Sequence, residues 1–498
     1  MRLERNTNLE LTNKCATATR RAFLSRSGWI VVGTGLPPQK IVASDAISPV
    51  MAKLSDYMAE TRNRAVPEEV LETAKEHILD TVAAMISGSR LPPGRAAIEF
   101  ARANAGHEIA TVVASNIRCD AMAAALANGV LAHSDETDDS HSPSQSHPGC
   151  SIVPGALAAG EQFGVAGLHF IRSVVLGYDI GTRVSMTLGG LRFQAESHRD
   201  THSICGGFGS AAAAGCAASL NPQQMRWLLD YAAQQTAGIA AWQRDTRHME
   251  KAFVFAGMTA RNGVTCALLV RSGWTGVDDI MSGPDNFLLA NAAKADPAGL
   301  IDELGERYEV MRTNIKKWPV GSPIQAPLDA LDMLLKGHSF NAAQVQRVNV
   351  RVATREAAIV DNRNMPDICL QHMVALMLID KTVTFRSAYD KTRMKDPAVL
   401  RERAKVQLIP DEDLDRQLPS REAIVEVILI DGTHLRERVD AVRGTAQNPM
   451  SREEVVAKAR DLITPVLGAE ICTNLIDKVL ALENVKDLRD LRPLLQRA

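Results

Sequence analysis

Apolar residues recur at helical spacing through the first half of the chain, most clearly between Pro67 and Gly88. Proline suits the first turn of a helix, the two glutamates that follow it complement the helix dipole, and Gly88 provides a stop. The apolar positions between them predict one amphipathic helix: Leu71, Ala74, Ile78, Val82, Met85 and Ile86. Similar alanine-rich patterns predict helices at residues 95–105, 120–132, 152–163, 206–220, 222–235 and 261–271. We therefore expect a helical domain over residues 46–272.

The pattern changes near Gly273, after which segments with alternating apolar and polar residues begin to replace apolar residues at helical spacing. A helix is still expected at 323–335, whereas three segments have the composition of strands: 348–354, 405–409 and 423–430. The last of them runs into Asp431-Gly432, which is typical of a hairpin turn. These signals predict an α+β domain with an antiparallel sheet over residues 273–445. The helical pattern returns at Ser451, so residues 446–498 are expected to pack back on the first domain.

Composition narrows the class of protein. Hydrophobic residues make up 46% of the 498 positions and aromatic residues only 4%, which favours closely packed helices over a β-sandwich. The net charge is −2 without a long basic block, so nucleic acid is not an expected partner. No run of apolar residues approaches the roughly 20 needed to span a bilayer, so no membrane partner is expected. None of the eight cysteines forms a C-x-x-C pair, which excludes zinc-ribbon, redox and iron–sulfur spacings.

The N-terminal segment differs from the rest of the chain. Residues 19–24 read TRRAFL and precede a weakly apolar stretch, an order that resembles a twin-arginine export signal. The alternative is an upstream extension that follows from a misassigned start codon. The first interpretation predicts a periplasmic protein and the second a cytoplasmic one, and residues 1–45 are left out of the fold in both cases.

A strongly polar stretch interrupts the apolar helices. Residues 133–151 read HSDETDDSHSPSQSHPGCS and contain three histidines and four acids. A metal site is one interpretation, but the stretch has no H-E-x-x-H spacing, and Pro143 and Pro148 place its later histidines in a loop. A solvated loop without function is the second interpretation. The third is a general acid/base site at the mouth of a pocket.

Three other segments favour the acid/base interpretation. His198 and His202 precede a glycine-rich entry into an alanine-rich helix, whose N-terminus would attract an anion. Lys251 lies in an apolar context ahead of a glycine, and Lys316 and Lys317 precede Trp-Pro. Lysines in such places either extend along apolar surface or bind carboxylates. Histidines, acids and separated lysines together suit a small polyanionic acid as substrate.

These segments together resemble the MmgE/PrpD family, whose members include 2-methylcitrate dehydratase, cis-aconitate decarboxylase and iminodisuccinate epimerase. The family's loop, H-S-x-D-x-D-D-T followed closely by H-P-S, is similar to residues 133–140 and 147–149 here. The other family motifs resemble the glycine-alanine run at 206–214, the lysine motifs at 251–263 and 316–319, and the lid helix at 365–380. The resemblance covers residues 50 to about 495.

The resemblance implies a mainly α fold with an α+β second domain. In the family the N- and C-terminal parts form one helical domain, an α+β lid domain is inserted between them, and the active site lies between the two. A homodimer is the expected assembly, and neither a metal nor an organic cofactor is expected. The chain departs from the family motif at Glu136, which replaces aspartate, at Ser140, which replaces threonine, and by one residue inserted before His147. The decarboxylase's lid tyrosine has no match near Arg355, which weakens the case for cis-aconitate and 2-methylcitrate.

The resemblance also implies roles for individual side chains. Its reactions begin with loss of a proton from a carbon next to a carboxylate, so a histidine acid/base and a lysine that stabilises the enediolate are expected. The expected catalytic residues are His147, assisted by Asp138 and Asp139, then His202 and Lys251, and the motif leaves open whether His202 or His198 is the second site histidine. The expected substrate-binding residues are Glu136, Ser140, Lys316 and His198.

A 2-methylcitrate dehydratase-like hydro-lyase that acts on a small di- or tricarboxylic acid is the expected activity. An epimerase of an iminodisuccinate-like acid and a decarboxylase are the enzymatic alternatives. The non-enzymatic alternative is an exported protein that binds a carboxylate or a metal.

Overall fold

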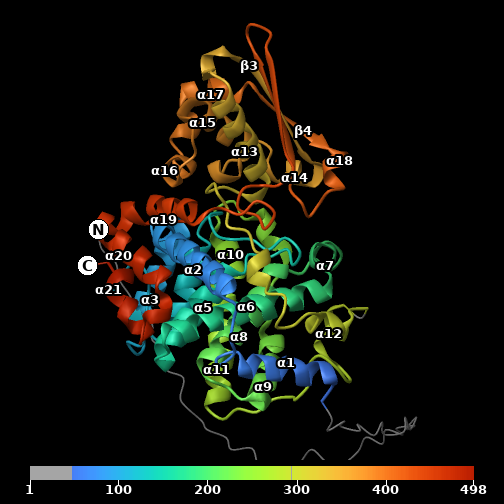
Figure 1. Cartoon of the computed structure of the whole chain (residues 1–498), viewed down its shortest axis with the longest axis vertical. Helices are drawn as coiled ribbons and strands as arrows, with labels where there is room; N and C mark the ends of the chain where they lie inside the picture. Colours follow the sequence, from blue (N-terminus) through green and yellow to red (C-terminus); the bar gives the residue numbers. More distant parts are fainter. Residues whose placement is uncertain (1–46, 293, 498) are drawn as a thin grey trace, which may run out of the picture. The chain divides into compact units, whose positions relative to one another are not determined.

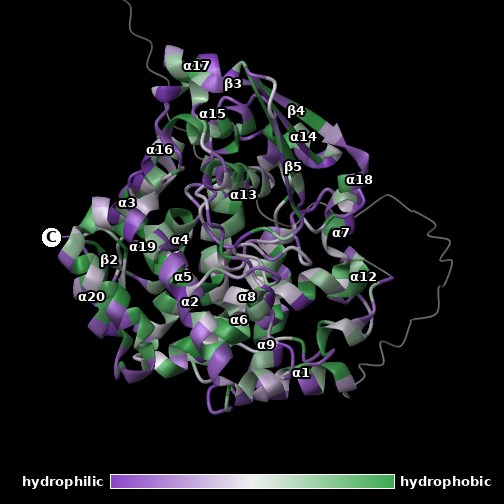
Figure 2. Ribbon diagram, turned by 45° about the horizontal axis from the view of Figure 1, so that its top comes forward, coloured by the Kyte–Doolittle hydropathy of each residue, from purple (hydrophilic) through white to green (hydrophobic). Residues whose placement is uncertain are grey.

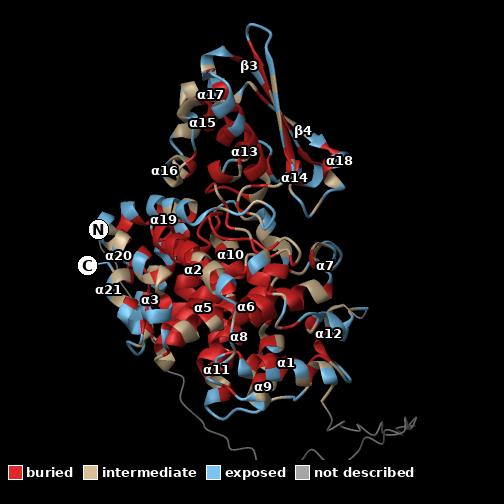
Figure 3. Cartoon of the chain, viewed as in Figure 1, coloured by how far each residue is buried: buried red, intermediate tan, exposed pale blue. Residues whose placement is uncertain are grey.

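The computed structural model describes residues 47–292 and 294–497, and the expected twin-arginine segment lies outside them. Small residues allow the central helices of the first core to approach closely. A Cβ atom added at Gly181 would lie 2.4 Å from the carbonyl oxygen of Cys205 on the neighbouring helix. Figure 3 shows that these central helices are largely buried: α2 (Glu68–Gly88), α5 (Gly149–Phe163), α6 (Gly167–Leu188), α8 (Thr201–Ala217) and α11 (Met258–Arg271).

Further helices from both ends of the chain complete this first core. From the N-terminal part come α1 (Pro49–Glu60), α3 (Pro92–Ala103), α4 (Ala121–Ala132), α7 (Gly190–Ser197), α9 (Pro222–Gln235), η1 (Ala240–Arg244), α10 (Met249–Ala252), η2 (Phe253–Gly257) and α12 (Phe287–Asn291). From the C-terminal part come α19 (Arg452–Leu467), α20 (Ala469–Leu480), η8 (Leu482–Asn484), η9 (Leu488–Leu491) and α21 (Arg492–Leu495). Outer helices such as α20 carry both hydrophilic and hydrophobic residues (Figure 2). Because Val455, Leu475 and Leu488 belong to the first core, the predicted helical domain from two chain parts is confirmed.

A second core surrounds a four-stranded sheet with the order β4-β3-β5-β6. The strands are β3 (Val345–Ala353), β4 (Val406–Asp411), β5 (Ala423–Leu429) and β6 (His434–Val439). Its helical elements are α13 (Ser322–Gly337), η5 (Ala342–Gln344), α14 (Thr354–Val360), η6 (Pro366–Ile368), α15 (Leu370–Asp380), α16 (Phe385–Tyr389), η7 (Arg393–Lys395), α17 (Pro397–Arg403) and α18 (Glu412–Asp415). Figure 1 shows α13, α14 and α15 beside β3 and β4. The α+β class predicted for this part is confirmed.

The expectation of a purely antiparallel sheet is wrong. The hairpin expected at Asp431-Gly432 joins β5 to β6 in an antiparallel pair, but β3 and β4 run parallel. Helices α14 to α17 lie between β3 and β4 in the chain, and a long helical crossover brings two strands together in the same direction. A two-stranded ribbon of β1 (Ala110–Thr111) and β2 (Arg118–Cys119), which no sequence pattern predicted, lies within the helical part.

The segment from residue 280 to 315 packs with the helical part. Ile280, Phe287, Leu300, Val310 and Ile315 all belong to the first core, and the second core begins at Trp318. The domain boundary expected near residue 273 therefore moves to residues 316–317. The sequence pattern placed it too early because this segment contains only short helices, including η3 (Pro297–Leu300) and η4 (Glu309–Arg312), whose apolar residues lack a sustained period.

Two buried helices were incompletely predicted. The long α6 is buried along most of its length and its buried residues include the polar Asp179 and Arg183, so the spacing of its apolar residues alone does not mark its buried faces. The continuous helical run Met249–Arg271 is long and apolar enough to cross a membrane by length and composition, but 67% of its most apolar window is buried inside the protein. This burial is typical of a core helix. The seven cysteines of the described residues are buried free thiols.

Candidate active site

The polar stretch that follows α4 is buried. Every residue from His133 to His141 is less than one tenth exposed, and His133, Asp138 and Asp139 are fully buried. Burial of so many ionisable groups is unfavourable unless they pair with one another. The interpretation of this stretch as a solvated loop is therefore wrong, and its pairing partners define a site.

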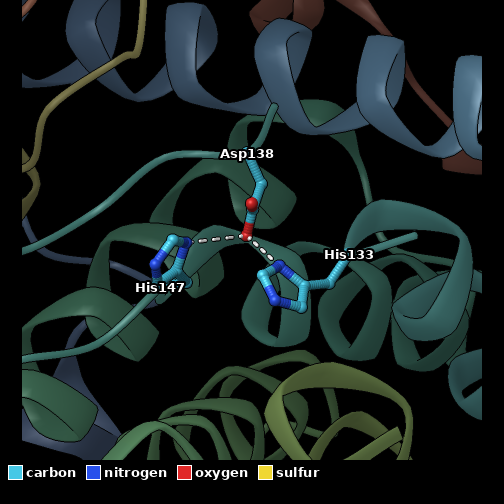
Figure 4. Close-up of side chains that lie close together, drawn as sticks. All are labelled: His133, Asp138 and His147. Carbon is cyan, nitrogen blue, oxygen red and sulfur yellow. Dashed lines mark hydrogen bonds and ion pairs between the residues drawn. The ribbon is translucent and has the colours of Figure 1, made fainter. Parts of the chain in front are cut away.

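Asp138 holds two histidines with one oxygen (Figure 4). Its Oδ2 lies 3.0 Å from Nδ1 of His133 and 3.2 Å from Nδ1 of His147. An ionised carboxylate only accepts hydrogen bonds, so each Nδ1 carries a proton that it donates to Asp138. Consequently, a neutral imidazole at either position keeps the lone pair of its Nε2 for another proton. His133 comes from the end of α4 and His147 from the loop just before α5, and the buried turn between them carries Asp138.

A second carboxylate–histidine pair comes from the start of α8. Nδ1 of His202 lies 2.9 Å from Oδ1 of Asp200, and the other oxygen of Asp200 caps the helix by accepting a hydrogen bond from the backbone N–H of Ser203 at 2.6 Å. Trp242 also donates to Asp200, at 2.9 Å. Since Asp200 is held by its own helix and by Trp242, the orientation of His202 is fixed in turn.

One aromatic ring brings the two pairs together. Phe255 stacks on His202 with ring centroids 3.6 Å apart and on His133 with centroids 4.7 Å apart. The rings of His147 and His202 are 5.3 Å apart. Phe255 lies in the π-helical turn η2, a distortion that often marks functional sites. We call His133, Asp138, His147, Asp200 and His202 the histidine cluster.

Burial keeps His147 and His202 of the histidine cluster neutral. It lowers the pKa of His147 well below 6.5, and the ammonium of Lys316 lowers that pKa further against the opposing effect of Asp138. Burial also lowers the pKa of His202, although Asp200 acts in the opposite direction. Both imidazoles can therefore accept a proton at pH 7.

Lys251 and Lys316 meet at the carboxylate of Glu136. Lys251 forms an ion pair with Oε1 of Glu136 and lies over the ring of Phe255, 5.1 Å from its centroid. The ammonium of Lys316 donates to the backbone oxygen of Glu136 at 2.7 Å and lies 3.7 Å from its Oε2. Burial alone would raise the pKa of Glu136, but the two ammonium groups hold this pKa well below its ordinary value of 4.5. The carboxylate is therefore ionised.

Asp139 points away from the histidine cluster. Its oxygens accept hydrogen bonds from Tyr178 at 2.5 Å, from the backbone N–H of Gly149 at 2.9 Å and from Nδ1 of His77 at 2.9 Å. It thus anchors the start of α5, two residues after His147. The adjacent Asp138 and Asp139 have different tasks, because successive side chains in this turn point in opposite directions.

Two expected substrate-binding residues, His198 and Ser140, do not share the contacts that join Lys316 to Glu136 and Asp138. His198 is exposed, ends α7 in a left-handed conformation with φ of 60°, and does not contact the cluster rings. His202 is therefore the histidine that this segment places beside His147. Ser140 pairs through its backbone with Asn314 and lines a cavity of about 230 Å³ together with Lys316 and Arg421.

Comparison with known proteins is consistent with this arrangement. The model of the MmgE/PrpD N-terminal domain matches residues 52–299, and that of the MmgE/PrpD C-terminal domain matches residues 318–483. The chain belongs to the MmgE/PrpD family. The gap between the two matched domains coincides with the end of the first core near residue 315.

The curated relatives of this MmgE/PrpD chain include three named for one reaction. A cis-aconitate decarboxylase-like protein, oryM, of Aspergillus oryzae is 24% identical and covers 90% of this chain and 97% of its own length. The cis-aconitate decarboxylase of Aspergillus terreus is 23% identical over 91% of this chain and 97% of its own length, and the human cis-aconitate decarboxylase is 25% identical over 86% and 91%. Family and relatives support an enzyme of the lyase type.

Several residues of the MmgE/PrpD site were missed by sequence reasoning. His133 and Asp200 complete the histidine cluster, and a signal for Asp200 existed, since aspartate one residue before a helix is a common cap. His248 is buried beside His133, with ring centroids 5.0 Å apart, and neither ring nitrogen has a hydrogen-bond partner among the described residues. Burial, together with the charges of Glu136 and Asp135, raises the pKa of Asp367 to about 7. Asp367 belongs to the segment 365–380 that resembles the family's lid helix, but only the fold shows that η6 lies near the loop.

Two triads of this MmgE/PrpD chain have ligand types suited to a divalent metal: His133, Asp138 and His147, and His133, Glu136 and His248. The nitrogens that His133 and His147 direct at Asp138 carry protons and are thus not lone-pair donors to a metal. In the second triad the Glu136 carboxylate already pairs with Lys251, and Lys316 lies close by. Two ammonium groups beside the ligands oppose a divalent cation, so neither triad fits a metal well.

Proposed function

We propose that the protein is a cofactor-independent lyase that removes a proton next to a carboxylate of a small di- or tricarboxylic acid. Hydro-lyase chemistry, as in 2-methylcitrate dehydratase, is the preferred reaction. The observation that carries the proposal is the pair of buried, neutral histidines, His147 and His202, each oriented by a carboxylate and lying 5.3 Å apart beside two lysines. This arrangement supplies bases for the carbon and cations for the charge that develops on the carboxylate.

His147 is the proposed first base. Its Nε2 takes the proton, and Asp138 stabilises the imidazolium that forms, because Nδ1 already donates to that carboxylate. The electron pair left on carbon moves into the neighbouring carboxylate, where Lys251 or Lys316 stabilises the enediolate. Loss of a hydroxyl from the adjacent carbon then forms the double bond, and the proton that His147 took up leaves with the hydroxyl as water.

Epimerisation is the second candidate, and the two histidines themselves favour it. An epimerase needs a base on one face of a carbon and an acid on the other, and two imidazoles with separate carboxylate partners supply both when one of them is in its protonated form. Decarboxylation is a third candidate, since the relatives above are named cis-aconitate decarboxylases. All three reactions share an enediolate-like intermediate.

A deuterium-exchange assay tests the proposal for all three reactions together. The purified full chain is incubated in D₂O with a panel of hydroxy, unsaturated and imino acids, with and without a chelator, and products are followed by NMR. Deuterium incorporation with loss of water identifies a hydro-lyase, inversion alone identifies an epimerase, and loss of CO₂ identifies a decarboxylase. Exchange that is equally fast for His147→Ala would overturn the role of His147 as the base, and binding without any turnover across the panel would overturn the proposal in favour of a binding protein.

A further inference from the structure

The imidazole of His248 lies beside the histidine cluster without a hydrogen-bond partner. The residue is only 6% exposed, and neither Nδ1 nor Nε2 is bonded to any of the residues that the structure describes. In water both nitrogens have partners, so their burial without any is unfavourable. A buried polar group that costs stability in this way points to a task in binding or catalysis.

The backbone of His248 is also in an unfavourable conformation. Its φ of 61° and ψ of 16° lie in the left-handed region, which residues other than glycine rarely adopt. The residue comes immediately before α10, whose third residue is Lys251. This turn brings both side chains to one carboxylate, because Nδ1 of His248 lies 4.0 Å from Oε1 of Glu136, the oxygen that pairs with Lys251. The strained backbone is thus a second, independent sign of function at this position.

The groups around His248 are spaced to share one oxygen atom. The 4.0 Å between His248 and Glu136 is too long for a direct hydrogen bond, but an oxygen can lie about 2.8 Å from both atoms. His133 belongs to the same group, since a nitrogen of each histidine and an oxygen of Glu136 lie within 4.8 Å of one another. Any three atoms at such distances have a common point no more than about 2.8 Å from each, which is the length of a hydrogen bond to oxygen.

The hydrogen-bonding capacity of these groups suits a hydroxyl. Burial and the charge of Lys251 lower the pKa of His248 to about 3, so at pH 7 its neutral imidazole has one N–H donor and one acceptor. The ionised Glu136 only accepts. Nε2 of a neutral His133 also accepts, because its Nδ1 donates to Asp138, and Nε2 is buried without a partner among the described residues. A hydroxyl can accept from His248 and donate to either acceptor, whereas a carboxylate has no proton to donate.

We infer that His248 is a catalytic residue that donates a hydrogen bond to a hydroxyl of the substrate, on the carbon next to the one that loses its proton. This inference rests on the proposed function, in which that hydroxyl is the leaving group. The hydrogen bond strengthens as negative charge develops on the departing oxygen. His248 therefore acts on the leaving group while His147 acts on the carbon, and the substrate class is a hydroxy acid. Acids with two or three carboxylates can carry such a hydroxyl.

Pairs of substrates measured on matched variants test the inference. The exchange assay gives kcat/KM for malate and citrate, and for succinate and tricarballylate, which have hydrogen in place of the hydroxyl. His248→Phe keeps a ring and removes both nitrogens, whereas His248→Asn suits the left-handed backbone and is too short to replace the imidazole. His372→Phe is the control, because His372 is also buried with both nitrogens unpartnered among the described residues but lies on α15, within the second core.

The wild type is expected to turn over at least one of the two hydroxy acids faster than its analogue. In both His248 variants kcat/KM for that hydroxy acid should fall roughly ten- to a hundred-fold, the range for loss of one hydrogen bond to a group that gains charge. For the analogue, kcat/KM should stay within about two-fold of the wild type, and its inhibition constant replaces kcat/KM where exchange is too slow to measure. His372→Phe should keep both values. Melting temperatures check that each variant folds.

The outcomes separate this inference from the proposed function. Absence of exchange with every acid of the wider panel would overturn both. Exchange by the wild type, combined with folded His248 variants that lose nothing or lose equal factors for the hydroxy acid and its analogue, would overturn the role of His248 alone. If neither His248 variant folds, the wild type decides, and a hydroxy acid that is turned over no faster than its analogue overturns the inference.

Discussion

The ring of His147 lies 5.3 Å from the ring of His202, and each ring donates its Nδ1 proton to a different aspartate. The two histidines come from separate elements, the loop before α5 and the first turn of α8. Their aspartates are fixed by different means, Asp138 by a shared histidine and Asp200 by a helix N-terminus. The site therefore holds two independently oriented bases, and the predictions below separate their contributions from those of their supports.

Replacement of His147 by alanine should lower kcat by a factor of about 10²–10⁴, the usual contribution of general acid–base catalysis. His198→Ala is the control, because His198 is exposed and outside the histidine cluster. It should leave kcat within about two-fold of the wild type, as surface substitutions do. Steady-state kinetics on the best substrate check both values, and equal losses in the two variants would contradict the assignment of the cluster.

Replacement of Asp138 by asparagine should mainly lower activity, whereas the same replacement of its neighbour Asp139 should mainly lower stability. Asp138→Asn should lower kcat by about 10² or more with a small change in melting temperature, since the orientation and charge stabilisation of His147 are lost. Asp139→Asn should mainly lower the free energy of unfolding, by about 1–3 kcal/mol, because it disturbs buried hydrogen bonds from Tyr178 and Gly149. Kinetics and denaturant unfolding measure the two effects. A kinetic loss without destabilisation in Asp139→Asn would place that residue in the chemistry instead.

The pH profile of kcat/KM should lack an acid limb at the ordinary histidine pKa of 6.5. Burial and Lys316 lower the pKa of His147, so the neutral base persists below that pH. Lys316→Met should move the acid limb to higher pH, because one of the groups that lower this pKa is removed. Profiles between pH 4 and 8 for the wild type and Lys316→Met test this shift, and superimposable acid limbs would argue against it.

The stability of the folded protein should also depend on pH through buried histidines. Burial lowers the pKa of His248 to about 3 and that of His372 to about 4, in both cases from 6.5. Below pH 6.5 these two histidines bind protons in the unfolded chain but stay neutral in the folded protein. Their contribution to the free energy of unfolding therefore falls as the pH falls from 6.5 towards 4. His372→Asn should lose less melting temperature than the wild type between pH 7 and 5. Equal losses in the two proteins would show that His372 does not contribute.

Lys251→Ala should raise KM and lower kcat, by about 10² or more in kcat if the ammonium stabilises the developing enediolate. Lys317→Ala is the matched control, because Lys317 pairs with Asp332 at 2.8 Å and lies over the ring of Trp318 in the second core. It should leave both constants near their wild-type values. A rise of KM alone in Lys251→Ala would restrict this lysine to binding.

The export prediction concerns residues 1–45, which lie outside the described part of the chain. If Arg20 and Arg21 form a twin-arginine signal, a fusion of residues 1–50 to a reporter should reach the periplasm, and replacement of both arginines by lysine should prevent this. Cell fractionation measures the distribution. A reporter that stays in the cytoplasm with the native arginines would favour a misassigned start.

The amino-acid sequence by itself determined the fold class and most elements of regular structure. Amphipathic spacing between Pro67 and Gly88 and the hairpin turn at Asp431-Gly432 are local signals, and the structure has a helix and a hairpin there. The sequence also pointed to the polar stretch from His133 as a candidate site. So many ionisable residues between apolar helices are stable only when they pair with one another. The buried α6 was not predicted, and its burial includes polar residues such as Asp179 and Arg183, whose partners only the fold supplies.

Only the tertiary structure decided which polar residues work together. Asp138 and Asp139 are neighbours in sequence, yet one faces the histidines and the other anchors α5. The choice of His202 over His198 depended on the packing of Phe255, and the approach of Lys316 to Glu136 joins segments that are far apart in the chain. Contacts of this kind arise from long-range packing, whose geometry no local pattern encodes. For that reason the sequence indicated the chemistry of the site, while the fold determined the partner of each charge.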